Sequence, residues 1–145
     1  MPFPLPLRPL PAPRETVPSF LSRFAAMNAA KMSDFSIDLG YQIRRFLELD
    51  TTALDRLAEA AGLEPAIRDD LVSWTGVPVG DVRMSFRGEA YVSRALRNPV
   101  IRGCPLCLRE DARAAPSHPE RLMAMRGDWL LRSVNLCCHH HHPLV

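Results

Sequence analysis

The sequence predicts an α+β protein, and three observations lead to this fold class. Helix-capping residues and apolar residues at helical spacing recur between residues 15 and 76. After residue 77 the hydrophobic pattern changes to the alternation of a strand. Two clusters of cysteine and histidine with the spacing of zinc ligands follow. We therefore expect a proline-rich extended arm (1–14), a helical, helix-turn-helix-like region (15–76), and a basic strand region with a zinc-ribbon-like module (77–145).

The N-terminal arm is dominated by proline. Residues 1–13 contain six of the fourteen prolines of the chain. Proline fixes φ and lacks an amide donor, so the arm is expected to be extended and close to polyproline II. The apolar residues that alternate with these prolines predict that the arm lies on the domain instead of extending into solvent. They are Phe3, Leu5, Leu7 and Leu10.

The region after the arm predicts a series of short helices. Thr16 can cap the first helix, with Pro18 in its first turn, and an apolar stripe follows at helical spacing. This stripe consists of Phe20, Leu21, Phe24 and Met27. Ser33 is expected to cap a second helix that ends at Gly40. A third segment has its own apolar stripe, made of Ile43, Phe46 and Leu47.

Two further helices around Gly62 have helix-turn-helix spacing. Thr51 or Thr52 is expected to cap the first, Gly62 to end it, and Pro65 to open the second. The residues expected to face inward are Leu54, Leu57, Ala58 and Ala61 in the first helix and Ile67, Leu71 and Trp74 in the second. The second helix carries three acids against one arginine, a balance that would repel DNA phosphates. We therefore expect a packing or protein-contact unit here and keep a DNA major-groove reader as the alternative.

The segment after residue 77 carries an excess of positive charge. Val82, Met84 and Phe86 alternate with polar residues, which predicts a strand with one apolar and one basic face. Between residues 83 and 132 there are ten arginines against five acids, although the net charge of the whole chain is only +2. Such an excess suits contact with a polyanion, and a solvated face is the alternative. The candidate nucleic-acid-binding residues are Arg83, Arg87, Arg94, Arg97 and Arg102.

The two clusters contain all four cysteines and four of the five histidines. Two residues separate Cys104 from Cys107, so both thiolates can reach one ion from a tight turn. Cys137 and His140 have the same spacing and would complete a tetrahedral Cys3His shell of the structural Zn²⁺ kind. A short helix after Cys107 and a strand from 129 to 136 are expected to connect the clusters, which is the layout of a zinc ribbon.

Other interpretations of the clusters remain open at this stage. Cys138 and His141 repeat the spacing of the second pair, and spacing alone does not choose between the two registers. Two disulfides are arithmetically possible, but the N-terminus lacks the pattern of a secretory signal. A redox Cys-x-x-Cys motif normally opens a helix in a βαβ unit, and that setting is not found here. Glu110 and Asp111 are expected to be solvated helix charges.

Three stretches together resemble the TniQ family, which includes TnsD and comprises target-selecting proteins of bacterial transposons. The first is Pro11-x-Pro13-x-Glu15-x-x-x-Ser19-Phe20-Leu21-Ser22-Arg23. The second is Arg102-x-Cys104-Pro105-x-Cys107-Leu108-x-Glu110-Asp111. The third is Trp129 followed by Cys137-x-x-His140-x-x-Pro143-Leu144-Val145. The resemblance spans almost the whole chain, is to the N-terminal module of the family, and favours Cys137 and His140 as the second pair of metal ligands.

The resemblance implies a non-catalytic adaptor for target-site selection in DNA transposition. Such a protein contacts DNA or a DNA-bound effector complex and recruits an AAA+ ATPase. It would be cytoplasmic, nucleoid-associated when bound, and without a membrane partner, since no apolar run approaches the length of a membrane span. The alternatives are a zinc-ribbon or helix-turn-helix transcriptional regulator and a metal-dependent hydrolase. The hydrolase would need an open metal with a nearby general base, and no carboxylate lies close to the second cluster in sequence.

Overall fold

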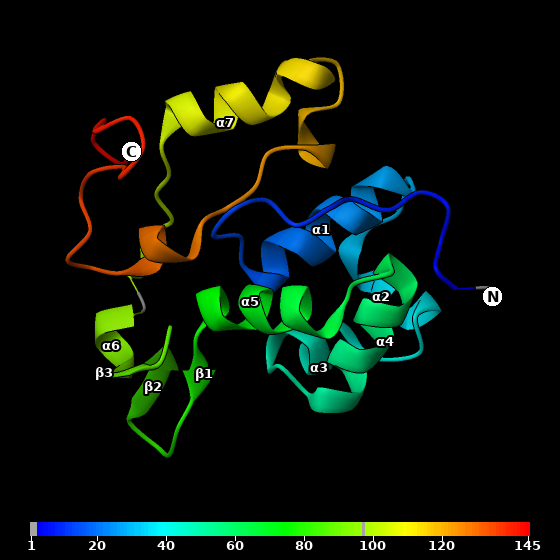
Figure 1. Ribbon diagram of the computed structural model, residues 1–145, viewed down its shortest axis with the longest axis horizontal. Helices are drawn as coiled ribbons and strands as arrows, with labels where there is room; N and C mark the ends of the chain where they lie inside the picture. Colours follow the sequence, from blue (N-terminus) through cyan, green and yellow to red (C-terminus); the bar gives the residue numbers. More distant parts are fainter. Residues whose placement is uncertain (1–2, 97) are drawn as a thin grey trace.

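The computed structural model describes residues 3–96 and 98–145, and its N-terminal half is helical (Figure 1). The helices of this half are α1 (Val17–Met27), α2 (Met32–Asp38), α3 (Ile43–Leu47), α4 (Thr51–Ala61) and α5 (Pro65–Thr75). They enclose one apolar core, whose largest buried side chains include Phe20, Phe24 and Phe46. Phe24 also packs against Phe35 of α2, with ring centroids 4.8 Å apart. Of the predicted stripes, Phe20, Leu21, Phe24 and Phe46 are buried in this core, Met27 and Ile43 are half-buried, and Leu47 is 45% exposed.

Some of the predicted helix ends are confirmed. Thr16 caps α1, and its hydroxyl accepts a hydrogen bond from the Ser19 N–H at 3.3 Å. Gly62 ends α4 in the left-handed conformation, at φ 66° and ψ 34°. A residue with a Cβ is strained there, which explains the glycine. Pro65 opens α5 in its first turn, as predicted.

Two predicted caps are wrong. Lys31, not Ser33, precedes α2, because the helix already begins at Met32 and the Phe35 N–H donates to the Lys31 carbonyl at 2.9 Å. Asp50, not Thr51 or Thr52, caps α4, and its carboxylate accepts the Ala53 N–H at 3.0 Å. Aspartate is as good a cap as threonine, and here it comes one residue before the helical backbone begins.

The inward face of α5 is narrower than predicted. Leu71 is buried, Trp74 is half-buried, and Ile67 is 42% exposed. In α4 the predicted Leu54, Leu57 and Ala61 are buried, while Ala58 is half-buried. Ile67 lies in the first turn of α5 and is not among the side chains that pack against the core.

The proline-rich arm lies against the helices, as predicted. Leu5 is buried, and its N–H donates to the Ala60 carbonyl at 2.8 Å. Figure 1 shows the arm passing along α1, where Asn28 donates to the Leu7 carbonyl at 2.9 Å. The side chains of Leu7 and Leu10 are exposed, so the arm is held partly through its backbone.

A three-stranded antiparallel sheet follows α5, with the order β1 (Val77–Pro78), β2 (Arg83–Phe86) and β3 (Glu89–Val92). In its register Met84 lies opposite Tyr91. Met84 and Phe86 are buried as predicted, whereas Val82 precedes the strand and is 64% exposed. The short helix α6 (Ser93–Leu96) follows β3.

The last part of the chain contains α7 (Pro105–Asp111) and the 3-10 turns η1 (Ala112–Ala114), η2 (Pro119–Arg121) and η3 (Gly127–Leu130). Figure 1 shows α1 between α7 and α5, whereas η3 lies against the end of α5. The strand predicted from 129 to 136 is wrong, because Trp129 belongs to η3. The Trp129 side chain is 1% exposed and packs beside Gly103, so a 3-10 turn and not a strand places this buried side chain.

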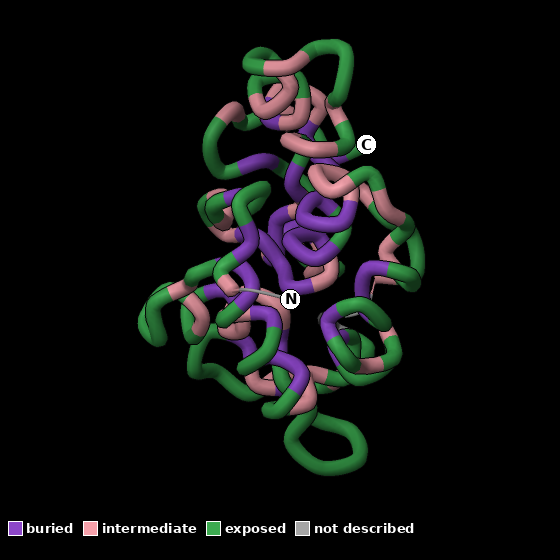
Figure 2. Tube along the Cα trace, turned by 90° about the vertical axis from the view of Figure 1, so that its right-hand side faces the viewer, coloured by how far each residue is buried: buried purple, intermediate pink, exposed green. Residues whose placement is uncertain are grey.

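Buried positions run through the middle of the molecule, and exposed loops lie at its two ends in Figure 2. The α+β class is confirmed, with the cysteine and histidine clusters at the C-terminal end compatible with a zinc-ribbon-like part. Within the described residues, every helix is too short or too polar to cross a lipid bilayer.

Candidate metal centre

Two tight turns bring the clusters together. Cys104 lies at the N-cap of α7 with Pro105 in the first turn, so Cys107 follows one turn later on the same side. The second turn is closed by two backbone hydrogen bonds, from the Cys137 N–H to the His142 carbonyl and from the His141 N–H to the Cys137 carbonyl. Both turns form locally, and they meet where Trp129 shares one buried cluster with the cysteines and where Gly103 and Val145 exchange two backbone hydrogen bonds.

Cys104, Cys107, Cys137 and His140 form one compact group, with their donor atoms all within 4.8 Å of one another. The Cys107 and Cys137 sulfurs are 3.5 Å apart. The His140 Nδ1 atom lies 3.3 Å from the Cys107 sulfur and 3.7 Å from the Cys104 sulfur. Tetrahedral zinc with ordinary bond lengths requires ligand separations of about 3.5–3.8 Å. The four donors therefore fit a metal ion of this size.

The other residues of the second cluster lie outside this group. Cys138 is exposed, and so are His139 and His141. His141 has a positive φ in this tight turn, and its side chain is not part of the donor group. The structure thus gathers the Cys137 and His140 register that the family resemblance favours.

Two backbone amides donate hydrogen bonds to the thiol of Cys137. The His139 and His140 N–H groups donate to the Cys137 sulfur at 3.4 and 3.5 Å. Burial opposes ionisation of Cys137, but these amides and the His140 ring outweigh it and lower the pKa to about 6. Burial raises the pKa of Cys107 to about 12, and its thiol neighbours add to the rise. The Cys137 thiolate is therefore stabilised by the protein itself, whereas the Cys107 thiolate needs an added cation.

The chemistry of such a site is structural. Three of the four candidate ligands are buried, and together the four complete a tetrahedral shell. A catalytic zinc keeps a position open for water. The arrangement therefore suits stabilisation of the fold, and it argues against the hydrolase alternative.

The predicted arginines differ in their surroundings. Arg83 and Arg94 are exposed. Arg87 lies over the Trp74 ring at 4.3 Å and pairs with Asp70 at 2.8 Å. Arg102 donates to the carbonyls of Leu131 and Val134 and to Asn135, so its guanidinium holds the connecting loop. Arg97 lies outside the described residues.

Sequence reasoning missed two roles beside the cluster. Asp111 pairs with Arg126 and accepts the Ala124 N–H at 3.0 Å. Glu110 lies 2.7 Å from the His140 Nε2 atom. These contacts contradict the expectation that both acids are simply solvated. Their spacing of three and four residues from Cys107 on one helix was the available signal, because such residues share a helix face.

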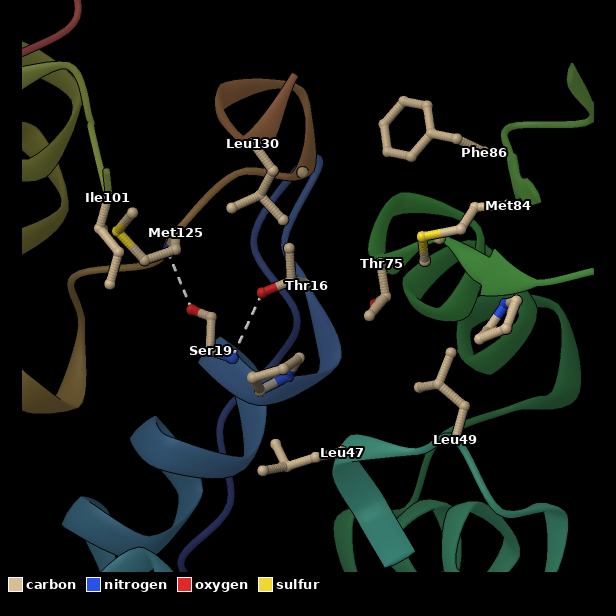
Figure 3. Close-up of a pocket in the computed structure, with 14 residues that line it drawn as sticks. Thr16, Ser19, Leu47, Leu49, Thr75, Met84, Phe86, Ile101, Met125 and Leu130 are labelled. Carbon is tan, nitrogen blue, oxygen red and sulfur yellow. Dashed lines mark hydrogen bonds between the residues drawn. The ribbon is translucent and has the colours of Figure 1, made fainter. Parts of the chain in front are cut away.

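An apolar cavity of about 320 Å³ lies where α1, α5, β2 and η3 meet (Figure 3). Figure 3 shows Leu49, Met84 and Leu130 from separate elements pointing towards it. The lining residues described are apolar or hydroxyl-bearing, and the hydroxyls are satisfied within the protein. Ser19 accepts the Met125 N–H at 2.9 Å, and Thr75 accepts the Val17 N–H at 2.8 Å. The cavity thus offers apolar surface and no group for acid–base chemistry.

Comparisons with known proteins gave one finding. The family model of TniQ matches residues 6–144. Neither the comparison with curated proteins nor the comparison with solved structures gave a match. The match includes the motifs of the arm, of α7 and of the C-terminal turn. The chain therefore belongs to the TniQ family.

Proposed function

We propose that this protein is a non-catalytic, zinc-binding adaptor for target-site selection in DNA transposition. The observation that carries the proposal is the family match over residues 6–144, which supports a role in transposition target selection. In this role the protein contacts DNA or a DNA-bound effector complex and recruits an AAA+ ATPase in the cytoplasm. Its contribution is to place partners relative to one another, so it needs binding surfaces and a stable framework.

Zinc is the metal that suits the cluster best. Three thiolates and one imidazole are soft and borderline donors, and a closed tetrahedral set of this composition is typical of structural zinc. The ligands would be Cys104, Cys107, Cys137 and His140. When bound, the ion supplies a cross-link between α7 and the C-terminal turn, and hence part of the folding free energy.

Exposed arginines supply the proposed DNA contact. Arg83 and Arg94 are exposed, whereas Arg87 and Arg102 already make contacts within the protein. We therefore place the larger contribution on the first two. Arg97 remains a candidate from the sequence.

The alternative function is a transcriptional regulator that reads DNA with α5. The charges on this helix disfavour it, because Glu64, Asp69 and Asp70 are exposed. The only arginine of the helix, Arg68, is paired with Asp55 at 2.6 Å. An acidic surface would repel the phosphates on either side of a groove.

A salt titration of DNA binding distinguishes the two functions. The double variant Arg83→Ala/Arg94→Ala should reduce the salt slope by about 0.9 for each DNA phosphate that the variant no longer neutralises. Arg68→Ala should leave the slope unchanged, and Arg44→Ala serves as an exposed, ion-paired control. A slope that changes only in Arg68→Ala would favour the regulator. Co-purification with the transposition ATPase of the same element tests the adaptor role directly, and its absence together with specific DNA binding would contradict the adaptor.

A further inference from the structure

The imidazole ring of His140 is held at both nitrogens. Its Nδ1 atom faces the thiols, 3.3 Å from the Cys107 sulfur. Its Nε2 atom lies 2.7 Å from a Glu110 carboxylate oxygen. A neutral imidazole carries one proton, and a carboxylate accepts but does not donate when it is ionised. In the neutral ring that a metal ligand requires, the contact therefore places the proton on Nε2 and leaves the Nδ1 lone pair directed at the cluster.

The contact follows from the geometry of α7. Glu110 comes three residues after Cys107, so both side chains lie on the same face of the helix. The helix thus presents a candidate ligand and a ring-orienting carboxylate to one histidine. The side chain of His140 is 15% exposed, whereas that of Glu110 is 42% exposed. The carboxylate lies at the rim and reaches the ring from the solvent side.

The neighbouring histidine has a weaker version of this contact. The His139 Nε2 atom is 3.9 Å from the second Glu110 oxygen, and its side chain is 66% exposed. This distance exceeds that of a hydrogen bond. Glu110 therefore distinguishes between two adjacent histidines of similar chemistry, and it engages the one whose Nδ1 faces the sulfurs.

We propose that Glu110 is a positioning residue of the metal centre. It selects His140 and fixes the tautomer that binds through Nδ1. It also restricts rotation of the ring, so that the ring loses less conformational entropy when the ion binds. The inference rests on the proposed metal centre and not on the adaptor role, because it is tested without DNA or ATPase. Carboxylates in this position typically strengthen metal binding by about 10–100-fold.

The experiment measures the affinity of the full chain for Zn²⁺ by competition with a chelator. Glu110→Ala should weaken zinc binding about 10–100-fold. Glu110→Gln should weaken zinc binding less, because its amide oxygen can still accept a hydrogen bond from the Nε2–H group. The matched control is Glu120→Ala, which removes a carboxylate that lies 3.4 Å from His118, away from the cluster. Equal affinity of Glu110→Ala and the unaltered chain would overturn the proposal.

The same substitution in a second variant shows whether Glu110 acts through the His140 ring or through a general effect on α7. His140→Cys keeps four soft ligands but removes the ring on which Glu110 acts. Adding Glu110→Ala to this variant should then change zinc affinity little, and the coupling between the two changes gives the contribution through the ring. An undiminished loss in the cysteine background would overturn the proposal. Nitrogen NMR of His140 in the zinc-bound protein should show a protonated Nε2, and a protonated Nδ1 would also overturn it.

Discussion

The Glu15 carboxylate lies 2.6 Å from the Nη1 atom of Arg23, and both side chains are buried. The same carboxylate accepts hydrogen bonds from the Ala12 N–H at 2.9 Å and the Ser19 hydroxyl at 2.7 Å. Ser19 in turn accepts the Met125 N–H. The ion pair therefore joins the arm and α1 to the segment that leads into η3, far away in sequence.

Replacing Glu15 by Ala should be strongly destabilising. The change leaves the Arg23 guanidinium buried without its anion, and breaking a buried pair from one side costs about 3–5 kcal/mol. Chemical denaturation measures the loss. Glu48→Ala is the control, because this acid belongs to an exposed pair with Arg44 and its removal should leave the midpoint nearly unchanged. Similar effects of the two substitutions would show that burial does not decide the role of Glu15.

The purified protein should contain about one zinc ion per chain, and Cys104→Ser should abolish tight binding. Cys104 is 0% exposed at the N-cap of α7, so its loss removes a buried ligand and destabilises the zinc-bound fold. Elemental analysis and thermal unfolding with and without a chelator test both effects, because metal binding and folding are coupled. Cys138→Ser is the matched control and should keep its zinc, since this thiol is exposed.

Substitution of the histidines in the C-terminal turn tests which Cys–His pair binds the metal. His140→Ala should lose zinc, while His141→Ala and His142→Ala should retain it, because only His140 lies in the compact donor group. Zinc retention in His140→Ala with loss in His141→Ala would instead assign Cys138 and His141 as the ligands. The same elemental measurement decides between the two patterns.

Gly127→Ala should destabilise the protein by at least about 3 kcal/mol. A Cβ at this position would lie 1.9 Å from the Trp74 carbonyl oxygen, which belongs to the backbone at the end of α5. Such an overlap forces α5 and η3 apart. Gly103→Ala makes a useful comparison, because its Cβ would meet the Trp129 ring at 3.1 Å and should cost only about 1 kcal/mol. A reversed order in denaturation midpoints would contradict this packing.

Asp50 should make stability depend on pH through the cap of α4. The Ala53 N–H holds the pKa of the Asp50 carboxyl below its usual value, with a further contribution from Arg45. Because the pKa of Asp50 is lower in the folded state, its charge stabilises the folded protein at pH values above the unfolded-state pKa of about 3.9. This stabilisation is lost as the pH falls through the folded-state pKa. Asp50→Ala should lower the melting temperature at neutral pH, and its difference from the unaltered protein should shrink in acid. Asp50→Asn keeps the cap but not the charge, so it should lose less than the alanine variant at neutral pH, and a loss as large as that of the alanine variant would assign the effect to charge alone.

The sequence by itself determined the features that depend on short stretches of chain. Thr16, Gly62 and Pro65 act where local capping chemistry places them. The alternation of Met84 and Phe86 predicted which side of β2 is buried. The spacing of the two clusters predicted four donors for one ion, because two residues between ligands is a property of a single tight turn.

Only the tertiary structure decided which partner each charged or metal-binding group meets. Glu15 and Arg23 belong to one predicted motif, yet the hydrogen bond of Ser19 to Met125 joins residues 106 positions apart. Arg87 and Arg102, predicted on a free basic face, meet distant partners for the same reason: Arg87 pairs with Asp70 at the surface, and Arg102 donates to the Val134 carbonyl. Spacing left Cys137–His140 and Cys138–His141 equivalent until the turn directed the side chains of one pair inward and those of the other outward. Periodicity records which face of an element is buried, whereas the pairing of polar groups depends on where distant segments come to lie.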